Sequence, residues 1–308
     1  MKITTQMINE VKAKGFLINR ATTKFSGRIV PRGTIFTAKD FAVMSEIADK
    51  FGNGKLMATS RQCIEISGIE YENIQAAIDF ASENGLSFGG TGAKVRPVTA
   101  CKGTTCIYGN IDTHRIATLI HDEFYVGRNS VKLPHKIKIS VGGCPNSCIK
   151  PSVNDIGIEG HKVPVFDEDK CKKCKKCVVE SSCPVKAAEF VDGKLIIDNK
   201  KCIDCGVCIE KCTFDAFDRE NTPPAYKIFI GGSWGKRTVK GTALSKYVTE
   251  EDILPIIEKT ILWFRDNAES KERLGAAIER IGFEKFEREV VESDELLCRR
   301  EEILNKEI

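Results

Sequence analysis

The chain has 308 residues and a net charge of +4, from 47 Lys and Arg against 43 Asp and Glu. So small a surplus gives no reason to expect a nucleic-acid binder, whose surface concentrates positive charge. Hydrophobic residues make up 42% of the chain and charged residues 29%. These values are typical of a globular protein with a proper core, and the length predicts about two domains.

Membrane and secretion signals are missing from the sequence. The longest stretch without Asp, Glu, Lys or Arg runs from Ile139 to Ile149, well short of the roughly 18 apolar residues of a membrane-spanning helix. The first residues, MKITTQMINEVKAKG, contain no apolar signal core. We therefore expect no membrane span and a cytoplasmic location.

The first structured region expected is a compact α/β unit from residue 24 to about 90. Thr37 can cap a helix that begins at Ala38, with Asp40 three residues on, and Gly52 is a natural stop. A strand containing Thr59-Ser-Arg-Gln62 should follow, because strand-like apolar residues flank it. A second apolar stripe at helical spacing predicts a helix from about Tyr71 to Asn84.

Cysteine is the outlier of the composition, with 14 residues. Disulfides suit small secreted domains, whereas a long chain with its own core and no signal favours metal thiolates. Cys63 and Cys298 stand apart from the other cysteines, and we expect both to be free thiols.

Two cysteine pairs, Cys101-x4-Cys106 and Cys144-x3-Cys148, lie 37 residues apart. Their spacing alone is compatible with one zinc ion or one [4Fe-4S] cluster. The segment from Leu133 to Val141 before the second pair alternates, which predicts a strand with Lys136 and Lys138 on one face. Two ammonium groups on one face beside a cysteine site suit a small anion, although a plain half-exposed strand would show the same pattern.

Arginines upstream of these pairs add further cationic groups. They are Arg28 in the extended segment RIVPRGTIF, Arg61 in the Thr59–Gln62 segment, and Arg96 before Pro97. Each alone is ordinary surface, but together they supply planar forks that bind carboxylates or an oxyanion.

The remaining cysteines form two consecutive runs, which resemble those of bacterial ferredoxins. In that pattern three close cysteines hold one cubane, and the fourth ligates the cluster of the other run. We assign one [4Fe-4S] cluster to Cys171, Cys174, Cys177 and Cys212 and a second to Cys202, Cys205, Cys208 and Cys183. Zinc is the alternative for paired CxxC motifs. The x5 spacing before Cys183 and Thr213 in place of a proline depart from the pattern.

Five lysines crowd the first run, namely Lys170, Lys172, Lys173, Lys175 and Lys176. They are either a solvated loop or a docking patch for an acidic electron donor. From Thr249 onward the sequence is strongly helical, and its charged repeats, including Lys271, Glu272, Arg273, Glu279 and Arg280, predict a solvated face.

Taken together, these segments resemble the siroheme-dependent sulfite and nitrite reductases, and most of all the C subunits of anaerobic sulfite reductases. The resemblance runs from about Lys24 to Val290 and rests on VPRGTIFT, ATSRQCIEISGI, Cys101-x4-Cys106, LPHKIKISVGGCPNSC, NDIGIEG and a later GGSWGKR segment. Two features depart from the family pattern. The first cysteine pair is one residue shorter than usual, and Pro31-Arg32-Gly33 replaces Pro-Gly-Gly.

The resemblance implies an α+β fold in three parts: a ferredoxin-like half-domain (1–90), a siroheme and [4Fe-4S] domain (91–160 and 225–308) and an inserted two-cluster ferredoxin domain (161–224). It also implies a role for each group of candidate residues. Cys101, Cys106, Cys144 and Cys148 hold a third [4Fe-4S] cluster, and Cys148 also bridges to the siroheme iron. Arg61, Lys136 and Lys138, with Arg28 and Arg96, line the anion pocket, while Lys236, Arg237 and Lys240 bind siroheme carboxylates.

The implied activity is the six-electron reduction of sulfite to sulfide, with electrons entering through the ferredoxin insert. Reduction of nitrite to ammonia, a non-enzymatic electron carrier on a degenerate reductase scaffold, and a siroheme or sulfite sensor are the alternatives. No GxGxxG fingerprint is visible, so iron-sulfur and flavin- or nicotinamide-binding donors should be other subunits. Because the chain holds one family repeat, we expect it to self-associate.

Overall fold

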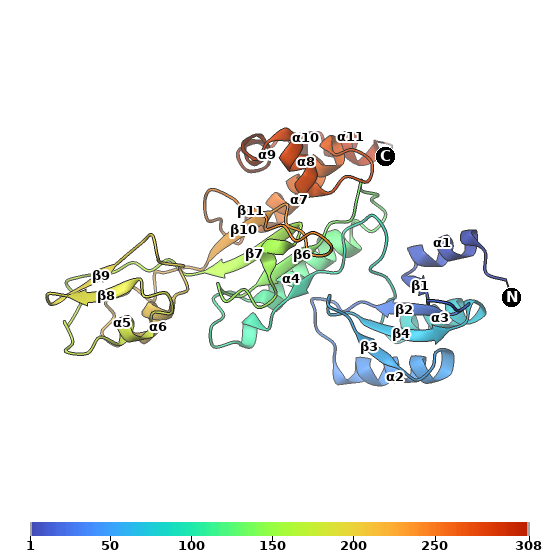
Figure 1. The fold of residues 1–308 in the computed structure, drawn as a ribbon, viewed down its shortest axis with the longest axis horizontal. Helices are drawn as coiled ribbons and strands as arrows, with labels where there is room; N and C mark the ends of the chain where they lie inside the picture. Colours follow the sequence, from blue (N-terminus) through green and yellow to red (C-terminus); the bar gives the residue numbers. More distant parts are fainter. Residues whose placement is uncertain (1, 307–308) are drawn as a thin grey trace. The chain divides into compact units, whose positions relative to one another are not determined.

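The computed structural model describes residues 2–306, which form two compact units, each built from separate segments of the chain (Figure 1). The first unit contains Met1–Thr99, His114–Ser140 and Ile256–Ile308, and the second contains Ala100–Thr113 and Val141–Pro255. Among the described residues, no helix has the length and apolarity needed to cross a membrane.

An antiparallel sheet of four strands, in the order β1-β2-β4-β3, forms the centre of the first unit's N-terminal part. The strands are β1 (Phe16–Ile18), β2 (Phe25–Ile29), β3 (Leu56–Ala58) and β4 (Ile64–Ile69). The register pairs Arg28 of β2 with Glu65 of β4, so these two side chains lie on the same face.

Helices cover this sheet and confirm the predicted pattern. They are α1 (Thr5–Ala13), α2 (Ala38–Phe51) and α3 (Ile74–Glu83), the last preceded by a short 3-10 turn (Tyr71–Asn73). Thr37 and Asp40 form a complete capping box, and Gly52 is the C-cap of α2. The apolar stripe of α2, including Met44 and Ile47, is fully buried against the strands.

Two expected strands are shorter in the structure than predicted. Thr59–Gln62 is not a strand but the turn that joins β3 to β4, and Gln62 takes a left-handed conformation there with φ 58°. In the second case only Ile139–Gly142 forms a strand, β6. The alternation was nevertheless correct: Ile137, Ile139 and Val141 are fully buried, whereas Lys136 and Lys138 are partly exposed.

A five-stranded sheet, in the order β11-β10-β7-β6-β5, organises the second unit. Its other strands are β5 (Thr99–Ala100), β7 (Ile156–His161), β10 (Ala225–Ile230) and β11 (Thr242–Ala243). Strands β7 and β10 are antiparallel and pair over their full length, which buries Ile158 against Ile228. The chain between them leaves the sheet at His161 and returns at Ala225, so residues 162–224 form an insertion.

The insertion is small and is built around its cysteines. Helices α5 (Val178–Ser182) and α6 (Val207–Lys211) accompany the hairpin of β8 (Ala188–Val191) and β9 (Lys194–Ile197). Its buried centre consists of Val179, Ala188, Leu195, Ile209, Ala216 and Phe217, with five of the cysteines packed against it. This apolar core is small, as in domains that need disulfides, metals or partners for their stability.

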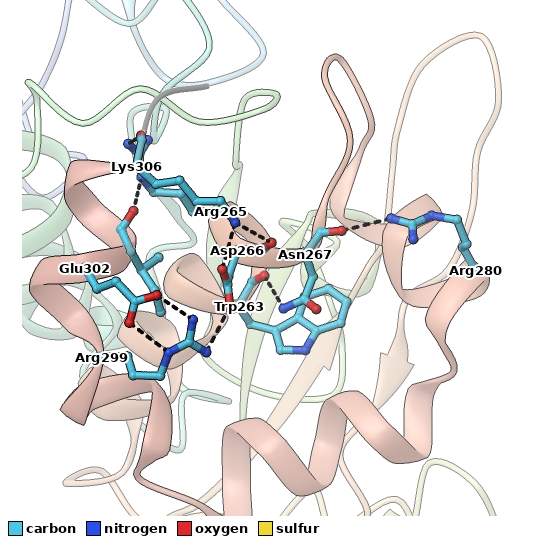
Figure 2. Close-up of polar contacts among 9 residues, drawn as sticks. Trp263, Arg265, Asp266, Asn267, Arg280, Arg299, Glu302 and Lys306 are labelled. Atoms are coloured by element: carbon cyan, nitrogen blue, oxygen red, sulfur yellow. Dashed lines mark hydrogen bonds and ion pairs between the residues drawn. The ribbon is translucent and has the colours of Figure 1, made fainter.

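The C-terminal region is helical, as predicted. Its helices are α7 (Ile253–Asn267), α8 (Leu274–Ile281), α9 (Phe283–Glu287), α10 (Glu295–Cys298) and α11 (Arg300–Asn305), and α4 (Thr113–Ile120) lies earlier in the chain. Figure 2 shows how polar groups tie these helices together. The buried Arg265 donates to the carbonyl oxygens of Ile303 at 2.7 Å and Leu304 at 3.0 Å at the end of α11.

Candidate functional site

Arginines gather around one carbonyl group in the first unit. Arg28 Nη1 donates to Gly90 O at 3.0 Å, and Arg96 Nη1 donates to the same oxygen. Arg28 also contacts Glu65, with Nε and Nη2 at 2.9 and 2.5 Å from one carboxylate oxygen. The charge of Arg28 is therefore balanced by Glu65, which leaves Arg96 as the more available cation of the two.

Arg61 connects the turn after β3 to both neighbouring segments. Its Nη2 donates to Pro97 O at 2.6 Å and to Ile139 O at 3.2 Å. The segment of Arg96 runs beside that of the lysines, because Arg96 N donates to Ile137 O at 2.8 Å. The fold thus places side by side the segments that carry the five cations singled out by the sequence: Arg28, Arg61, Arg96, Lys136 and Lys138.

Burial shapes the electrostatics of this group. It lowers the pKa of Arg96 to about 10, with Arg28 nearby contributing in the same direction, so the guanidinium stays protonated at neutral pH. Arg96 Nε is buried and has no hydrogen-bond partner among the described residues. The same region holds Cys63, whose pKa burial raises to about 11. Cys63 is therefore a neutral buried thiol, as expected.

The two cysteine pairs of the second unit come together at the ends of β5 and β6. Gly143 N donates to Cys101 Sγ at 3.1 Å, and Cys101, Cys148 and Cys106 all act electrostatically on Cys144. Burial, as the main cause, raises the pKa of Cys144. A thiol that stays protonated without a metal must release its proton when it becomes a ligand.

Two glycines make this close approach of the chain possible. A Cβ atom on Gly143 would lie 2.9 Å from the Cα of Gly103 and 3.5 Å from Cys101 Sγ. The space there admits no side chain, so the glycines of the motif Gly142-Gly143-Cys144 seat the second cysteine pair against the first. Thr113 Oγ1 donates to Cys101 O at 2.7 Å and fixes the first pair from the other side.

The eight cysteines of the insertion line two cavities, four in each. One cavity is lined by Cys171, Cys174, Cys177 and Cys212, together with Val179, Leu195 and Phe217. The other is lined by Cys183, Cys202, Cys205 and Cys208, together with Pro184 and Ile197. These are the two sets that the ferredoxin pattern assigns, and in each the fourth cysteine comes from the opposite run. Thiols arranged around a cavity fit a multi-atom cluster better than a single ion.

Backbone donors contact two of these thiols, and burial keeps two of them protonated. Ala187 N donates to Cys183 Sγ at 3.2 Å, and Asp204 N donates to Cys202 Sγ at 3.4 Å. Such N–H···S bonds tune the potential of a bound iron-sulfur cluster. Burial raises the pKa of Cys202, and it raises that of Cys208 to about 12.

A chain of polar contacts beside the second cavity escaped the sequence analysis. Tyr247 donates from its hydroxyl to Asp204 Oδ2 at 2.6 Å, and its ring packs on that of His161. His161, only 3% exposed, also contacts Glu159 Oε1 and Ile203 O, each at 3.1 Å. No spacing in the sequence links these positions, because the strands and the insertion bring them together only on folding.

The same side of the insertion is held close to the loop of Cys144. Asn110 Nδ2 donates to Cys205 O at 3.3 Å and to Gly160 O at 3.4 Å. Cys144 and Cys205 line one cavity, together with Tyr108, Asn146, Ser182, Pro184 and Lys211. The set of cysteines that contains Cys205 is thus the one that neighbours the pairs Cys101–Cys106 and Cys144–Cys148.

The basic residues expected to bind siroheme carboxylates form an exposed hairpin. Lys236 and Arg237 lie in its turn, which the pairing of Ser233 with Val239 closes, and Lys240 follows. Gly241 N donates to Ser152 O at 2.7 Å, so the hairpin is tied to the segment that follows Cys148.

Comparison with known proteins identifies the family of this chain. Residues 91–296 match the family model of the nitrite and sulphite reductase 4Fe-4S domain, and residues 19–82 match that of the nitrite/sulfite reductase ferredoxin-like half domain. The chain belongs to the nitrite and sulfite reductase family. Its fold is therefore an α+β combination of these two domains.

Three curated relatives illustrate the family's range. The chain is 33% identical over 263 residues to the coenzyme F420-dependent sulfite reductase of Methanocaldococcus jannaschii. This alignment covers 84% of this chain but 41% of that protein. It is 31% identical over 272 residues to the beta subunit of the dissimilatory-type sulfite reductase of Nitratidesulfovibrio vulgaris, covering 79% of this chain and 71% of that one. The C subunit of the anaerobic sulfite reductase of Salmonella typhimurium is 28% identical over 289 residues, covering 86% and 82%.

Solved structures share the fold. A crystal structure of dissimilatory sulfite reductase I superimposes with a TM-score of 0.70 at 19% identity, covering 87% of this chain and 69% of that one. The NirA protein of Mycobacterium tuberculosis gives 0.64 at 16% identity, covering 96% and 48%. The chain thus spans less than half the length of NirA and of the first curated relative.

Proposed function

We propose that this chain is a siroheme- and iron-sulfur-dependent reductase that converts sulfite to sulfide with six electrons. The observation that carries the proposal is the gathering of three sets of four cysteines in one compact unit of a sulfite reductase family member. When bound, siroheme and the clusters supply anion ligation and one-electron transfers, which the side chains of a protein cannot provide.

The cysteines have distinct proposed roles. Cys101, Cys106, Cys144 and Cys148 would hold the cluster linked to siroheme, and Cys148, an exposed thiol, would provide the link to siroheme. The buried Gly103–Gly143 contact fits this assignment, since it draws the two pairs together without filling the space between their thiols. Lys236, Arg237 and Lys240 bind the siroheme carboxylates as exposed cations near the segment after Cys148.

The cationic group of the first unit binds the oxyanion and holds protons for it. Arg61 and Arg96 are oriented by backbone carbonyls, so their positions are fixed before the anion arrives. Lys136 and Lys138 supply protons as oxygen atoms leave as water. Arg28 acts less directly, because its guanidinium is bound by Glu65 and positions the carbonyl of Gly90.

The insertion receives the electrons in this proposal. We keep the domain bounds expected from the sequence. Residues 1–90 form the half-domain, residues 91–160 and 225–308 form the siroheme and [4Fe-4S] domain, and residues 161–224 form the two-cluster ferredoxin domain inserted into it. Cys205 shares a cavity with Cys144, which makes the set Cys183, Cys202, Cys205 and Cys208 the inner one. In this proposal the protein is a cytoplasmic sulfite reductase of the anaerobic type and forms an oligomer. Its electron donors are other subunits, which carry iron-sulfur, flavin or nicotinamide groups.

The test begins with the anaerobically purified chain, in which iron, sulfide and extracted tetrapyrrole are counted. Siroheme with about twelve cluster irons supports the proposal. Iron for two clusters without tetrapyrrole, after siroheme has been supplied, indicates an electron carrier instead. Turnover is then compared for sulfite and nitrite with one reductant. Faster turnover of nitrite would make reduction to ammonia the activity.

The role of the lysines is tested by Lys136→Met, with the exposed Lys132→Met as the matched control. Lys136→Met should keep siroheme and all clusters but lower kcat for sulfite by about 10²-fold, the range of one proton-transfer or electrostatic contact. Equal kcat in the two variants would remove Lys136 from the mechanism.

A further inference from the structure

The first cysteine run of the insertion carries a concentrated positive charge. Five of the seven residues from Lys170 to Lys176 are lysines, and all five are exposed. Lys170 pairs with Asp167 at 3.6 Å. The other four, Lys172, Lys173, Lys175 and Lys176, form no ion pair with any residue that the structure describes.

One of these lysines, Lys172, lies at the outer cysteine cavity, and the others are its neighbours in the sequence. Lys172 itself lines that cavity, as do Lys211, Val178 and Phe214. Val178 is 53% and Phe214 48% exposed. A small apolar area bordered by cations, directly over a redox site, has the composition of a docking surface.

The second run provides an internal comparison, because it has the same CxxCxxC spacing and a different surface. The residues between its cysteines are Ile203, Asp204, Gly206 and Val207, and none of them is exposed. Ile203 and Asp204 are bound by His161 and Tyr247. The run that faces the sheet is thus uncharged or acidic and covered, while the run that faces solvent carries the lysines. Coordination of a cluster does not require the lysines, so they serve another purpose.

We propose that Lys172, Lys173, Lys175 and Lys176, with Val178 and Phe214, form the docking face for a protein electron donor whose own redox centre is surrounded by acidic side chains. The inference deepens the proposed function and rests on it, because it identifies where and from what class of partner electrons arrive. Each encounter transfers one electron: the donor is oxidised, and the outer cluster, held by Cys171, Cys174, Cys177 and Cys212, is reduced. No atom or proton needs to cross the interface.

The charges act mainly on the rate of encounter. Electrostatic steering raises association rates by about 10- to 10³-fold and weakens steeply with salt. The apolar pair at the centre supplies contact area once the complex has formed. A fast and salt-sensitive association suits an electron carrier, which must dissociate after every transfer.

The test uses the full chain with its clusters and, as probe, a small acidic [2Fe-2S] ferredoxin. The docking variant is Lys173→Glu with Lys176→Glu, and its matched control is Lys39→Glu with Lys55→Glu, two exposed lysines of the first unit with the same change in net charge. Stopped-flow spectroscopy measures cluster reduction by the reduced ferredoxin and, separately, by a small uncharged reductant. Binding of a redox-inert, metal-substituted form of the ferredoxin gives a second readout that needs no electron transfer.

At about 10 mM salt the Debye length is ~30 Å, so charges on the two proteins attract or repel each other over a long range. Under these conditions the ferredoxin should reduce the docking variant at least tenfold more slowly than the wild type. The docking variant should also bind the inert ferredoxin correspondingly more weakly. The difference should vanish near 1 M salt, and the control should behave as the wild type. Both variants should react normally with the uncharged reductant. The neutral variant Lys173→Gln with Lys176→Gln should fall between the two and guards against damage by the introduced carboxylates.

Equal rates for the docking variant and its control would overturn the proposal, as would a wild-type rate that does not depend on salt. Failure of the proposed function is a separate result. If the chain binds no siroheme or does not reduce sulfite, while the lysine-dependent reduction remains, the docking face stands and the reductase assignment falls.

Discussion

The contact between Gly143 and Gly103 gives a sharp test of how the siroheme-linked cysteine site is built. In Gly143→Ala the new Cβ would lie 2.9 Å from a backbone Cα and 3.3 Å from the Cγ2 of Thr113. Ordinary contacts of this kind are 3.5 to 4 Å, so the two backbone segments must separate by roughly half an ångström or more. Overpacking of this kind costs about 1–3 kcal/mol. Because 1.4 kcal/mol is a factor of ten in an equilibrium constant, we expect about 30-fold weaker retention of the third cluster.

The assay counts iron and sulfide during a timed challenge with a chelator, together with circular dichroism as a check of folding. Gly143→Ala should lose one cluster's worth of iron early and keep the two clusters of the insertion. Gly193→Ala is the control. Gly193 lies in the β8–β9 turn with φ 78° and nothing near its Cβ, so the substitution strains the backbone without crowding a cysteine site. Retention of all the iron in Gly143→Ala would refute the reasoning.

Three further predictions follow from buried polar groups. Arg265→Met removes the hydrogen bonds to the end of α11 (Figure 2) and should lower the free energy of unfolding by about 3 kcal/mol. Arg299→Met breaks more exposed ion pairs and should lower it far less; thermal or urea unfolding measures both. Tyr247→Phe removes the hydroxyl donor to Asp204 and leaves more negative charge near the inner cluster, so redox titration should show a potential lower by about 20–60 mV with unchanged iron content. Burial lowers the pKa of His121 below its ordinary value of 6.5. The contribution of neutral His121 to the free energy of unfolding should therefore be fully present above pH ~6.5 and should decrease as the pH drops below it. In His121→Gln the melting temperature should differ less between pH 7.5 and pH 5.5 than it does in the wild type.

The cation group illustrates how packing distributes roles among residues of one type. Arg28, Arg61 and Arg96 look alike in the sequence, yet the first is bound by Glu65 and the second by two carbonyl groups. Arg96 keeps a buried Nε donor without a partner among the described residues. Such a donor is costly when unused, so an acceptor beside Arg96 would stabilise it.

Local sequence determined the elements whose signals lie within one or two turns of chain. The capping box of Thr37 and Asp40 fixed the start of α2, and alternation in Leu133–Val141 correctly separated buried isoleucines from partly exposed lysines. The resemblance of the two cysteine runs to those of bacterial ferredoxins divided the eight cysteines of the insertion into the two sets that the cavities contain. These signals are reliable because hydrogen bonding over three residues and ligation by a short loop depend on few distant contacts.

Only the tertiary structure decided what surrounds each group. Thr59–Gln62 reads as a strand, but the pairing of β3 with β4 makes it a turn and directs Arg61 toward Pro97 and Ile139. The Tyr247–Asp204 bond joins positions far apart in the chain, and the lysines of the first run gain their meaning because the second run is covered and they are not. The physical reason is common to all of these cases: partners and burial depend on contacts distant in sequence, which no local pattern records.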